Sequence, residues 1–315
     1  MDDMRLQISM PEYPYVFDHG SQFLMMGSCF AEEMGTRMAA LRFKTVMNPN
    51  GILYAPLSIA DVLRRAIEGE TYTKKDLLTR EDIVLSWQHH GSIYGMDQTA
   101  FLERINGKVS DLKASLESAD VLILTFGTAY HWVLKEEEQR VVNCHKQASS
   151  KFEKVLYSTK QLAQDYTELI QDLMQINPKL RVVLTVSPVR YKRDGLIENN
   201  RSKARLLLLC ELLEAQFESI SYFPSYELLI DSLRDYRFYA KDRVHPSEEA
   251  VDYVWERFLD SCFTDPCKTL TQKIASYNRS ANHRPLYPES IAAKKFESNL
   301  KIKAKELQDL LKKYL

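Results

Sequence analysis

The chain has 315 residues, of which 45% are hydrophobic and 27% charged, so it can bury a sizeable core and does not have the composition of a disordered protein. Lysine and arginine together number 42 and aspartate and glutamate 43, so the formal net charge is only -1 and gives no field to steer nucleic acid or an anionic membrane toward the protein. Nucleic acid and membrane lipid are therefore not expected as partners.

The amino-terminal stretch MDDMRLQISMPEYPYVF carries acidic residues where a signal peptide is basic, and it lacks a continuous apolar segment. No apolar run approaches the roughly 18 to 20 residues that span a bilayer. The sequence thus predicts a cytoplasmic protein. The five cysteines are widely spaced and form no paired C-x-x-C arrangement, so neither a zinc site nor a disulfide framework is indicated. No P-loop or G-x-G-x-x-G stretch supports a nucleotide, and no metal or organic cofactor is expected.

Short apolar stretches alternate with helical periodicity from residue 20 to about 263, a pattern that indicates a doubly wound α/β fold with a mostly parallel sheet. The clearest strands are nearly all apolar, as in strands buried on both faces. Strands are predicted at 23–26, 43–47, 120–126, 180–186 and 220–223, and helices at 31–41, 56–68, 159–176, 199–218 and 248–262.

Three segments depart from this alternation. Residues 72–110 are polar and mixed and predict a long insertion near one end of the sheet. HWVLKEEEQRVVNCHK, residues 131–146, has two β-rich arms around a charged turn and predicts a protruding hairpin. We expect an α/β domain over 1–265 and a helical extension over 266–315.

The carboxyl-terminal tail from Ser290 carries seven lysines against three acidic residues. Its apolar residues recur at helical spacing, so the tail predicts an amphipathic helix that packs on its own domain or on a second subunit. A homodimer through this helix is one of these two alternatives. The apolar positions are Phe296, Leu300, Ala304, Leu307, Leu311 and Tyr314.

Ser28 lies between the first predicted strand and the first predicted helix, in LMMGSCFAEEMG. In an open α/β sheet the loops at the carboxyl ends of the strands bind ligands, so a side chain here is well placed for chemistry. Serine is also a favoured helix N-cap, and by itself the position indicates a structural role at least as strongly. The neighbouring Cys29 is a second candidate nucleophile, because a thiolate needs less activation than a hydroxyl.

Asp242 and His245 stand three residues apart in YAKDRVHPSEEAVDYVW, just before a predicted helix. A serine hydroxyl becomes a nucleophile when an imidazole accepts its proton and a carboxylate orients that imidazole. The spacing lets one turn of chain present both side chains together. It is equally typical of an aspartate that caps a turn beside a surface histidine.

Several blocks of the chain resemble the GSCFA family, which is similar in turn to the SGNH or GDSL-like hydrolases. They occur in the family's order and span roughly residues 20–263. The resemblance implies a three-layer α/β/α fold and assigns Ser28 as nucleophile, Asp242 as acid and His245 as base. The blocks include GSCFA, NPNGILYAPLSIA, TFGTAYHW, VVNCHK, TVSPVR, ENNRSKA and YFPSYELLIDSLRDYRFYAKDRVHPS.

The oxyanion hole implied by the resemblance is incomplete. The wider group uses the amide of the nucleophile, the amide of a second-block glycine and an asparagine side chain from the third block. Ser28 and Gly51 match the first two, but the third block reads Gly-Thr-Ala, in which Thr128 offers a hydroxyl rather than an amide. Other candidates for this third donor are Asn48, Asn50 and His90.

Further polar residues could contact a substrate: His90, His145, Arg190, Asn199 and Arg201. The arginine and asparagine side chains could bind a carboxylate, a sugar hydroxyl or a phosphate, or could equally tie down their own loop. The expected function is hydrolysis of an O-acyl ester, foremost an O-acetyl group on a small molecule or carbohydrate. The alternatives are an O-acyltransferase and a catalytically silent binding protein.

Overall fold

A five-stranded parallel sheet forms the centre of the protein, in a computed structural model that describes residues 6–314. Its strand order is β10-β9-β5-β1-β2, so the chain starts near the middle and winds outward in both directions. All five strands were predicted from the sequence. They are β1 Gln22–Gly27, β2 Lys44–Met47, β5 Val121–Phe126, β9 Arg181–Val186 and β10 Ile220–Phe223.

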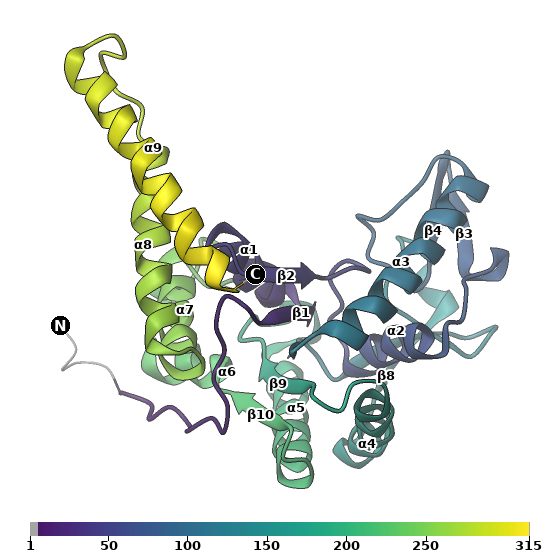
Figure 1. Ribbon diagram of the computed structural model, residues 1–315. Helices are drawn as coiled ribbons and strands as arrows, with labels where there is room; N and C mark the ends of the chain where they lie inside the picture. The colour runs from purple at the N-terminus through teal and green to yellow at the C-terminus, as the bar shows by residue number, and fades with distance from the viewer. Residues whose placement is uncertain (1–5, 315) are drawn as a thin grey trace.

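Alternate residues of the central strands pack into two separate apolar clusters, one on each face of the sheet. Leu122 and Leu124 contact the cluster that holds α2, α3, α4 and α5, whereas Val121 and Ile123 contact the one that holds α1, α7 and α8. Figure 1 shows these two groups of helices on opposite sides of the strands. The predicted three-layer α/β/α fold is confirmed. The helices are α1 Cys29–Ala40, α2 Pro56–Glu68, α3 Gln98–Ser118, α4 Thr159–Ile176, α5 Leu196–Gln216, α7 Glu248–Cys262 and α8 Asp265–Ala281.

The insertion contains a helix that was not predicted. Strands β3 Leu77–Arg80 and β4 Ile83–Ser86 form a hairpin, and α3 then begins at Gln98 within the stretch expected to be merely polar. About one residue per turn of α3 is buried and the rest of its surface is polar. The buried residues are Phe101, Ile105, Val109, Leu112 and Leu116.

The predicted hairpin after the central strand is confirmed, with a third strand added to it. Strands β6 Tyr130–Leu134, β7 Gln139–Val141 and β8 Phe152–Leu156 form an antiparallel sheet in the order β7-β6-β8. Only three residues separate the end of β5 from the start of this small sheet, which therefore lies near the carboxyl edge of the central sheet.

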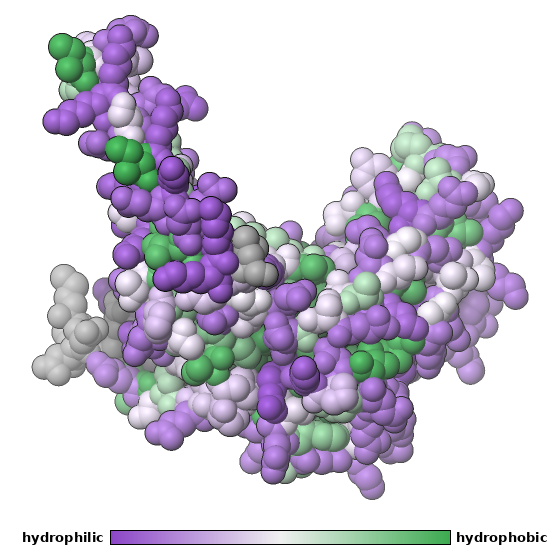
Figure 2. Space-filling model, in the orientation of Figure 1, coloured by the Kyte–Doolittle hydropathy of each residue, from purple (hydrophilic) through white to green (hydrophobic). Residues whose placement is uncertain are grey.

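The carboxyl-terminal segment forms an arm of two helices, α8 and α9 Ile291–Leu311, that packs side by side and projects from the body (Figure 1). The base of the arm shares the apolar cluster of the sheet through Ile274 and Leu307. Most of its surface is hydrophilic in Figure 2, with apolar side chains at the tip. The amphipathic helix is thus present and packs on its own chain, while the homodimer and the domain boundary after residue 265 stay predictions.

Short helical turns complete the described part of the chain, and none of its helices is long and apolar enough to cross a bilayer. These turns are η2 Lys74–Asp76, η3 Ser149–Lys151, η4 Lys192–Asp194, α6 Ser225–Glu227, η5 Leu228–Ser232, η6 Tyr236–Phe238 and η7 Lys312–Tyr314.

Candidate active site

The turn from β1 into α1 requires a glycine at position 27. Gly27 has φ +137°, and a Cβ atom there would lie 2.2 Å from the carbonyl oxygen of Thr125 on β5. The backbone of β1 can therefore approach β5 closely at the point where it ends. Ser28 and the first turn of α1 follow directly at the carboxyl edge of the sheet.

The hydroxyl of Ser28 is not used as a helix cap. Ser28 is the N-cap residue of α1, yet its side chain makes no capping hydrogen bond. Its Oγ is buried and has no hydrogen-bond partner among residues 6–314. Buried hydroxyl groups are normally paired, so an unpaired one at a strand end calls for a functional explanation.

Asp242 and His245 form a hydrogen-bonded pair. The Nδ1 atom of His245 lies 2.6 Å from Oδ2 of Asp242, while Oδ1 of Asp242 accepts the amides of Val244 and His245 at 2.8 and 3.0 Å. These bonds, first of all the one from the imidazole, hold the pKa of Asp242 well below its usual range. Asp242 thus remains a carboxylate and can hold the imidazole with Nε2 free to accept a proton.

His245 lines a small pocket of about 200 Å³ together with Cys29, at the amino-terminal end of α1. Ser28 does not line this pocket, and no hydrogen bond joins its Oγ to His245. Burial raises the pKa of the Cys29 thiol, and the positive charge of Lys203 opposes that rise. The structure therefore brings His245 into one pocket with Cys29, the residue that follows Ser28.

The two backbone amides assigned to the oxyanion hole are both occupied. The amide of Ser28 donates to the carbonyl of Thr125 at 3.0 Å, and that of Gly51 donates to the carbonyl of Asn48 at 2.7 Å. The amide of Thr128 donates to the carbonyl of Tyr54. In this structure none of these N–H groups is free to meet a developing oxyanion.

The side-chain candidates differ in whether they have a free donor. Asn50 is buried, and its Nδ2 lies 3.2 Å from both the hydroxyl of Tyr72 and Nε2 of His89. In contrast, Oδ1 of Asn48 accepts the amide of Gly27 at 2.9 Å, whereas Nδ2 of Asn48 is buried without a partner in the described chain. Asn48 is therefore the candidate with an unused amide donor beside the Gly27–Ser28 turn.

The two histidines proposed for substrate contact lie together, away from the pocket of His245. His90 packs over Gly51, where a Cβ atom would come within 2.5 Å of the His90 Cβ. His145 is buried, its Nε2 is 2.8 Å from the carbonyl of Ser86, and burial lowers its pKa. The bond to Ser86 requires the Nε2–H tautomer, which gives His145 a structural role.

The residues proposed from the SPVR and ENNRSKA blocks are dispersed. Arg190 donates to the hydroxyl of Tyr239 at 3.1 Å, and Asn199 is buried with its Oδ1 accepting the amide of Tyr191. Arg201 is exposed and pairs with Glu198 on its own helix. Asn199 and Arg201 thus have structural partners, and Arg190 alone lies near the loop that carries Asp242.

Lys203, which was not proposed as a site residue, is the buried cation of this edge. Its Nζ donates to the carbonyls of Gly127 and Ser187, which follow β5 and β9. Burial lowers the pKa of Lys203 to about 7, and the nearby Cys29 thiol opposes the fall. The lysine of ENNRSKA was visible in the sequence, but its burial follows from where α5 packs and could not be anticipated from the motif.

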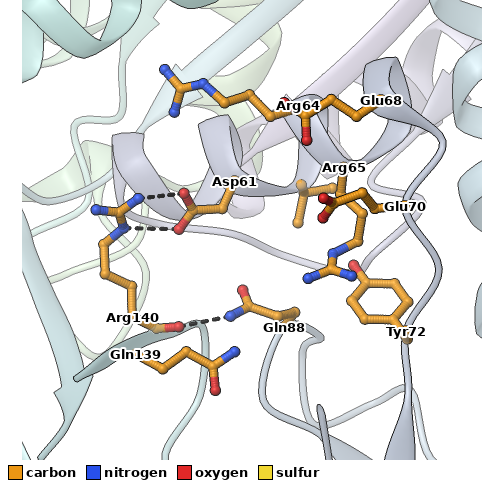
Figure 3. Close-up of a pocket in the computed structure, with 10 residues that line it drawn as sticks. Asp61, Arg64, Arg65, Glu68, Glu70, Tyr72, Gln88, Gln139 and Arg140 are labelled. Atoms are coloured by element: carbon orange, nitrogen blue, oxygen red, sulfur yellow. Dashed lines mark hydrogen bonds and ion pairs between the residues drawn. The ribbon is translucent and has the colours of Figure 1, made fainter. Parts of the chain in front are cut away.

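A second pocket, of about 280 Å³, lies beside α2 (Figure 3). Two of its three arginines are engaged within it: Arg140 forms a two-pronged ion pair with Asp61, and Arg65 lies 4.3 Å from the ring centre of Tyr72. Within residues 6–314 there is also no cluster of side chains suited to hold a metal ion. This pocket is therefore a weaker candidate for a reactive site than the carboxyl edge.

The fold and the Asp242–His245 pair define a doubly wound α/β protein with a hydrogen-bonded aspartate–histidine pair at the carboxyl edge of its sheet. The family model of the GSCFA family matches residues 22–258, and the chain belongs to that family. A comparison with curated proteins finds no match. Membership in the GSCFA family is consistent with a hydrolase-like function.

Proposed function

We propose that the protein is a serine hydrolase of the SGNH type that cleaves an O-acyl ester, foremost an O-acetyl ester. The observation that supports this most is the 2.6 Å bond between His245 and Asp242, beside the turn that carries Ser28. The unpaired Ser28 hydroxyl adds to it, because neither helix capping nor another hydrogen bond accounts for that group.

In the proposed reaction Oγ of Ser28 attacks the ester carbonyl carbon and its proton passes to Nε2 of His245. Asp242 stabilises the resulting imidazolium through Nδ1. The tetrahedral intermediate then expels the alcohol, which takes the proton from His245. Water attacks the acyl-serine with His245 again as base, and the carboxylic acid leaves as Ser28 regains its proton.

The charge that develops on the ester oxygen needs a donor other than the amides of Ser28 and Gly51. We assign this role to Nδ2 of Asn48, which is buried and unpaired in the described chain next to the nucleophile turn. An oxyanion donor of this kind typically contributes a factor of about 10² to 10³ in kcat. His245 must also approach Ser28, since the two are not hydrogen-bonded in this structure.

Turnover of 4-nitrophenyl acetate by the wild type and by Ser28→Ala and Cys29→Ala tests the proposal. We expect Ser28→Ala to abolish turnover and fluorophosphonate labelling, and Cys29→Ala to retain both. The opposite pattern would move the nucleophile to Cys29, which is supported by its place in the His245 pocket. Wild type that neither hydrolyses the ester nor reacts with the fluorophosphonate would contradict the hydrolase and favour a binding protein.

An acyltransferase at the same site is distinguished by the acceptor. Added alcohols would then raise the rate of 4-nitrophenol release and yield the transferred ester, whereas a hydrolase gives free acetate at every alcohol concentration. The backbone amides of Ser28, Gly51 and Thr128 are already hydrogen-bonded within the protein, and this observation is the reason to test the acyltransferase as an alternative.

A further inference from the structure

A cavity of about 800 Å³ adjoins the candidate active site on the side of the small antiparallel sheet. Its walls include Trp132 and Tyr130 from β6, and Tyr54 and Tyr191 from the loops that follow β2 and β9. Both Tyr54 and Tyr191 are close enough to Cys29 to interact with it electrostatically. This volume is within the range of sites for small organic molecules, and it is far larger than an acetyl group needs.

The amino-terminal end of α2 faces this cavity. Its N-cap residue, Ala55, has no side chain that could cap the helix, and the first turn contains no acidic residue. The amide of Leu57 donates to Nε2 of His131 at 3.0 Å and is therefore not available to a ligand. Of the first turn of α2, Ala55 and Ser58 line the cavity. The partial positive charge of a helix start favours an anion at this position.

Ser58 supplies a second, independent indication of a ligand. The residue is only 4% exposed, it lines the cavity, and its hydroxyl makes no hydrogen bond to any residue the structure describes. The oxygen atom itself is not fully buried and keeps surface that is open to the cavity. Here it is available to a molecule inside the cavity.

The charged side chains around the cavity are mainly positive. Lys146, Lys154 and Arg193 line it, against Asp194 as the one acidic lining residue, and Asp194 already forms an ion pair with Lys154. Lys146 and Arg193 have no acidic partner within residues 6–314. The cavity therefore presents two uncompensated cations in addition to the end of α2.

We propose that this cavity binds an organic molecule of about the size of a sugar ring that carries a carboxylate or a phosphate. The anionic group lies at the start of α2, where Ser58 donates to it, and Lys146 and Arg193 neutralise it. The ring lies against the aromatic wall of Tyr130 and Trp132. We assign this molecule as the alcohol part of the ester substrate, and that assignment rests on the proposed function. The binding of the molecule to the cavity does not depend on the proposed function.

Isothermal titration calorimetry with glucose 6-phosphate, galacturonate and glucose tests the binding directly. We expect the wild type to bind at least one of the two anionic sugars tenfold or more tightly than glucose. Tighter binding of glucose 6-phosphate identifies a phosphate as the recognised group, and tighter binding of galacturonate identifies a carboxylate. Equal affinities for all three sugars, or binding of none of them, would overturn the proposal.

Variants locate the site. Lys146→Met/Arg193→Met is expected to remove the preference for the anionic sugar, and Ser58→Ala to weaken its binding about fivefold to tenfold because a charged hydrogen bond is lost. The matched control is Lys135→Met/Lys160→Met, which removes two exposed lysines that do not line the cavity and should keep the preference. A preference that survives in Lys146→Met/Arg193→Met would place the anion elsewhere.

A catalytic experiment separates this proposal from the proposed function. O-acetyl galacturonate and O-acetyl glucose are compared as substrates, and the charged ester should have the lower KM in the wild type but not in Lys146→Met/Arg193→Met. Selective binding of an anionic sugar without any hydrolysis would reject the hydrolase and leave the binding site standing. Hydrolysis of both esters with equal KM would support the hydrolase and show that the cavity does not bind the alcohol part of its substrate.

Discussion

Lys203 is a buried lysine that has no acidic partner within the described residues. It is 1% exposed, and its Nζ bonds two carbonyl oxygens rather than a carboxylate. A buried lysine without an acidic partner is rare, because its charged form loses hydration that the carbonyls only partly replace. The pKa of about 7 expresses that cost.

The stability of the protein should consequently depend on the charge of Lys203. Above pH 7 the folded state releases this proton while the unfolded state keeps it up to about pH 10.5, so the free energy of unfolding should rise with pH in this window. The rise is at most about 1.4 kcal/mol per pH unit. Urea unfolding of wild type and Lys203→Met between pH 7 and pH 10 measures it.

In Lys203→Met this contribution should vanish, which flattens the dependence on pH. Arg190→Met provides a control, because it removes a cation that lies partly exposed against Tyr239. Parallel pH dependences in wild type and Lys203→Met would show that Lys203 does not titrate in this window.

At the same scale, the sequence predicted the candidate site only where the chemistry is local. Asp242 and His245 are three residues apart, so their pairing follows from one turn of chain. Whether a backbone amide is free to act as an oxyanion donor depends on the hydrogen bonds that its loop makes. The amide of Gly51, for example, donates to the carbonyl of Asn48 within its own turn. That competition, like the burial of Lys203, is decided by packing between distant segments.

Helices and strands, too, were predictable from the sequence only where their residue pattern is locally distinct. The central strands were predictable because both faces are buried, and the residues of β5 are accordingly apolar apart from Thr125. Helix α3 was missed because a mostly exposed helix needs only about one apolar residue per turn, which a polar background conceals. Strand β8 was missed because only Phe152 of its five residues is buried.

The start of α3 offers a test of its boundary. Asp97 is the N-cap, and its Oδ1 accepts the amide of Ala100 at 2.8 Å. Asp97→Ala should lower the free energy of unfolding by about 1 kcal/mol, because that amide loses its partner. Urea denaturation compares it with Asp111→Ala, an exposed site in the middle of the same helix, where a change within about 0.5 kcal/mol is expected. Equal effects of the two substitutions would contradict the boundary.

At the scale of the whole molecule, the two-helix arm is anchored to the body through Leu307 of α9 and along α8 as far as Asn278, whose Nδ2 donates to the carbonyl of Ala40 at 2.8 Å. Leu307 of α9 is 4% exposed and packs with the apolar cluster beneath the sheet, whereas Ile302 on the same helix is 58% exposed. One end of the arm is therefore buried against the body, while the part that projects from the body is mostly hydrophilic, as Figures 1 and 2 show.

Leu307→Ala should consequently destabilise the protein by about 2 to 3 kcal/mol, because it leaves a cavity in a shared cluster. Ile302→Ala should change the free energy of unfolding by about 0.5 kcal/mol or less. Thermal and urea unfolding of both variants measure the difference. If Leu307→Ala were as mild as Ile302→Ala, the arm would contribute nothing to the stability of the sheet.

The last described residues pack against the segment before β1 and against the start of β2. The ring of Tyr314 lies 5.7 Å from that of His19, and Lys44 donates to the Tyr314 carbonyl at 3.0 Å across 270 positions of sequence. During synthesis on the ribosome, the edge strand β2 and the segment before β1 emerge long before the residues that cover them. Their apolar side chains stay uncovered until Tyr314 has been synthesised, and apolar surface that is exposed for so long promotes aggregation of the nascent chain.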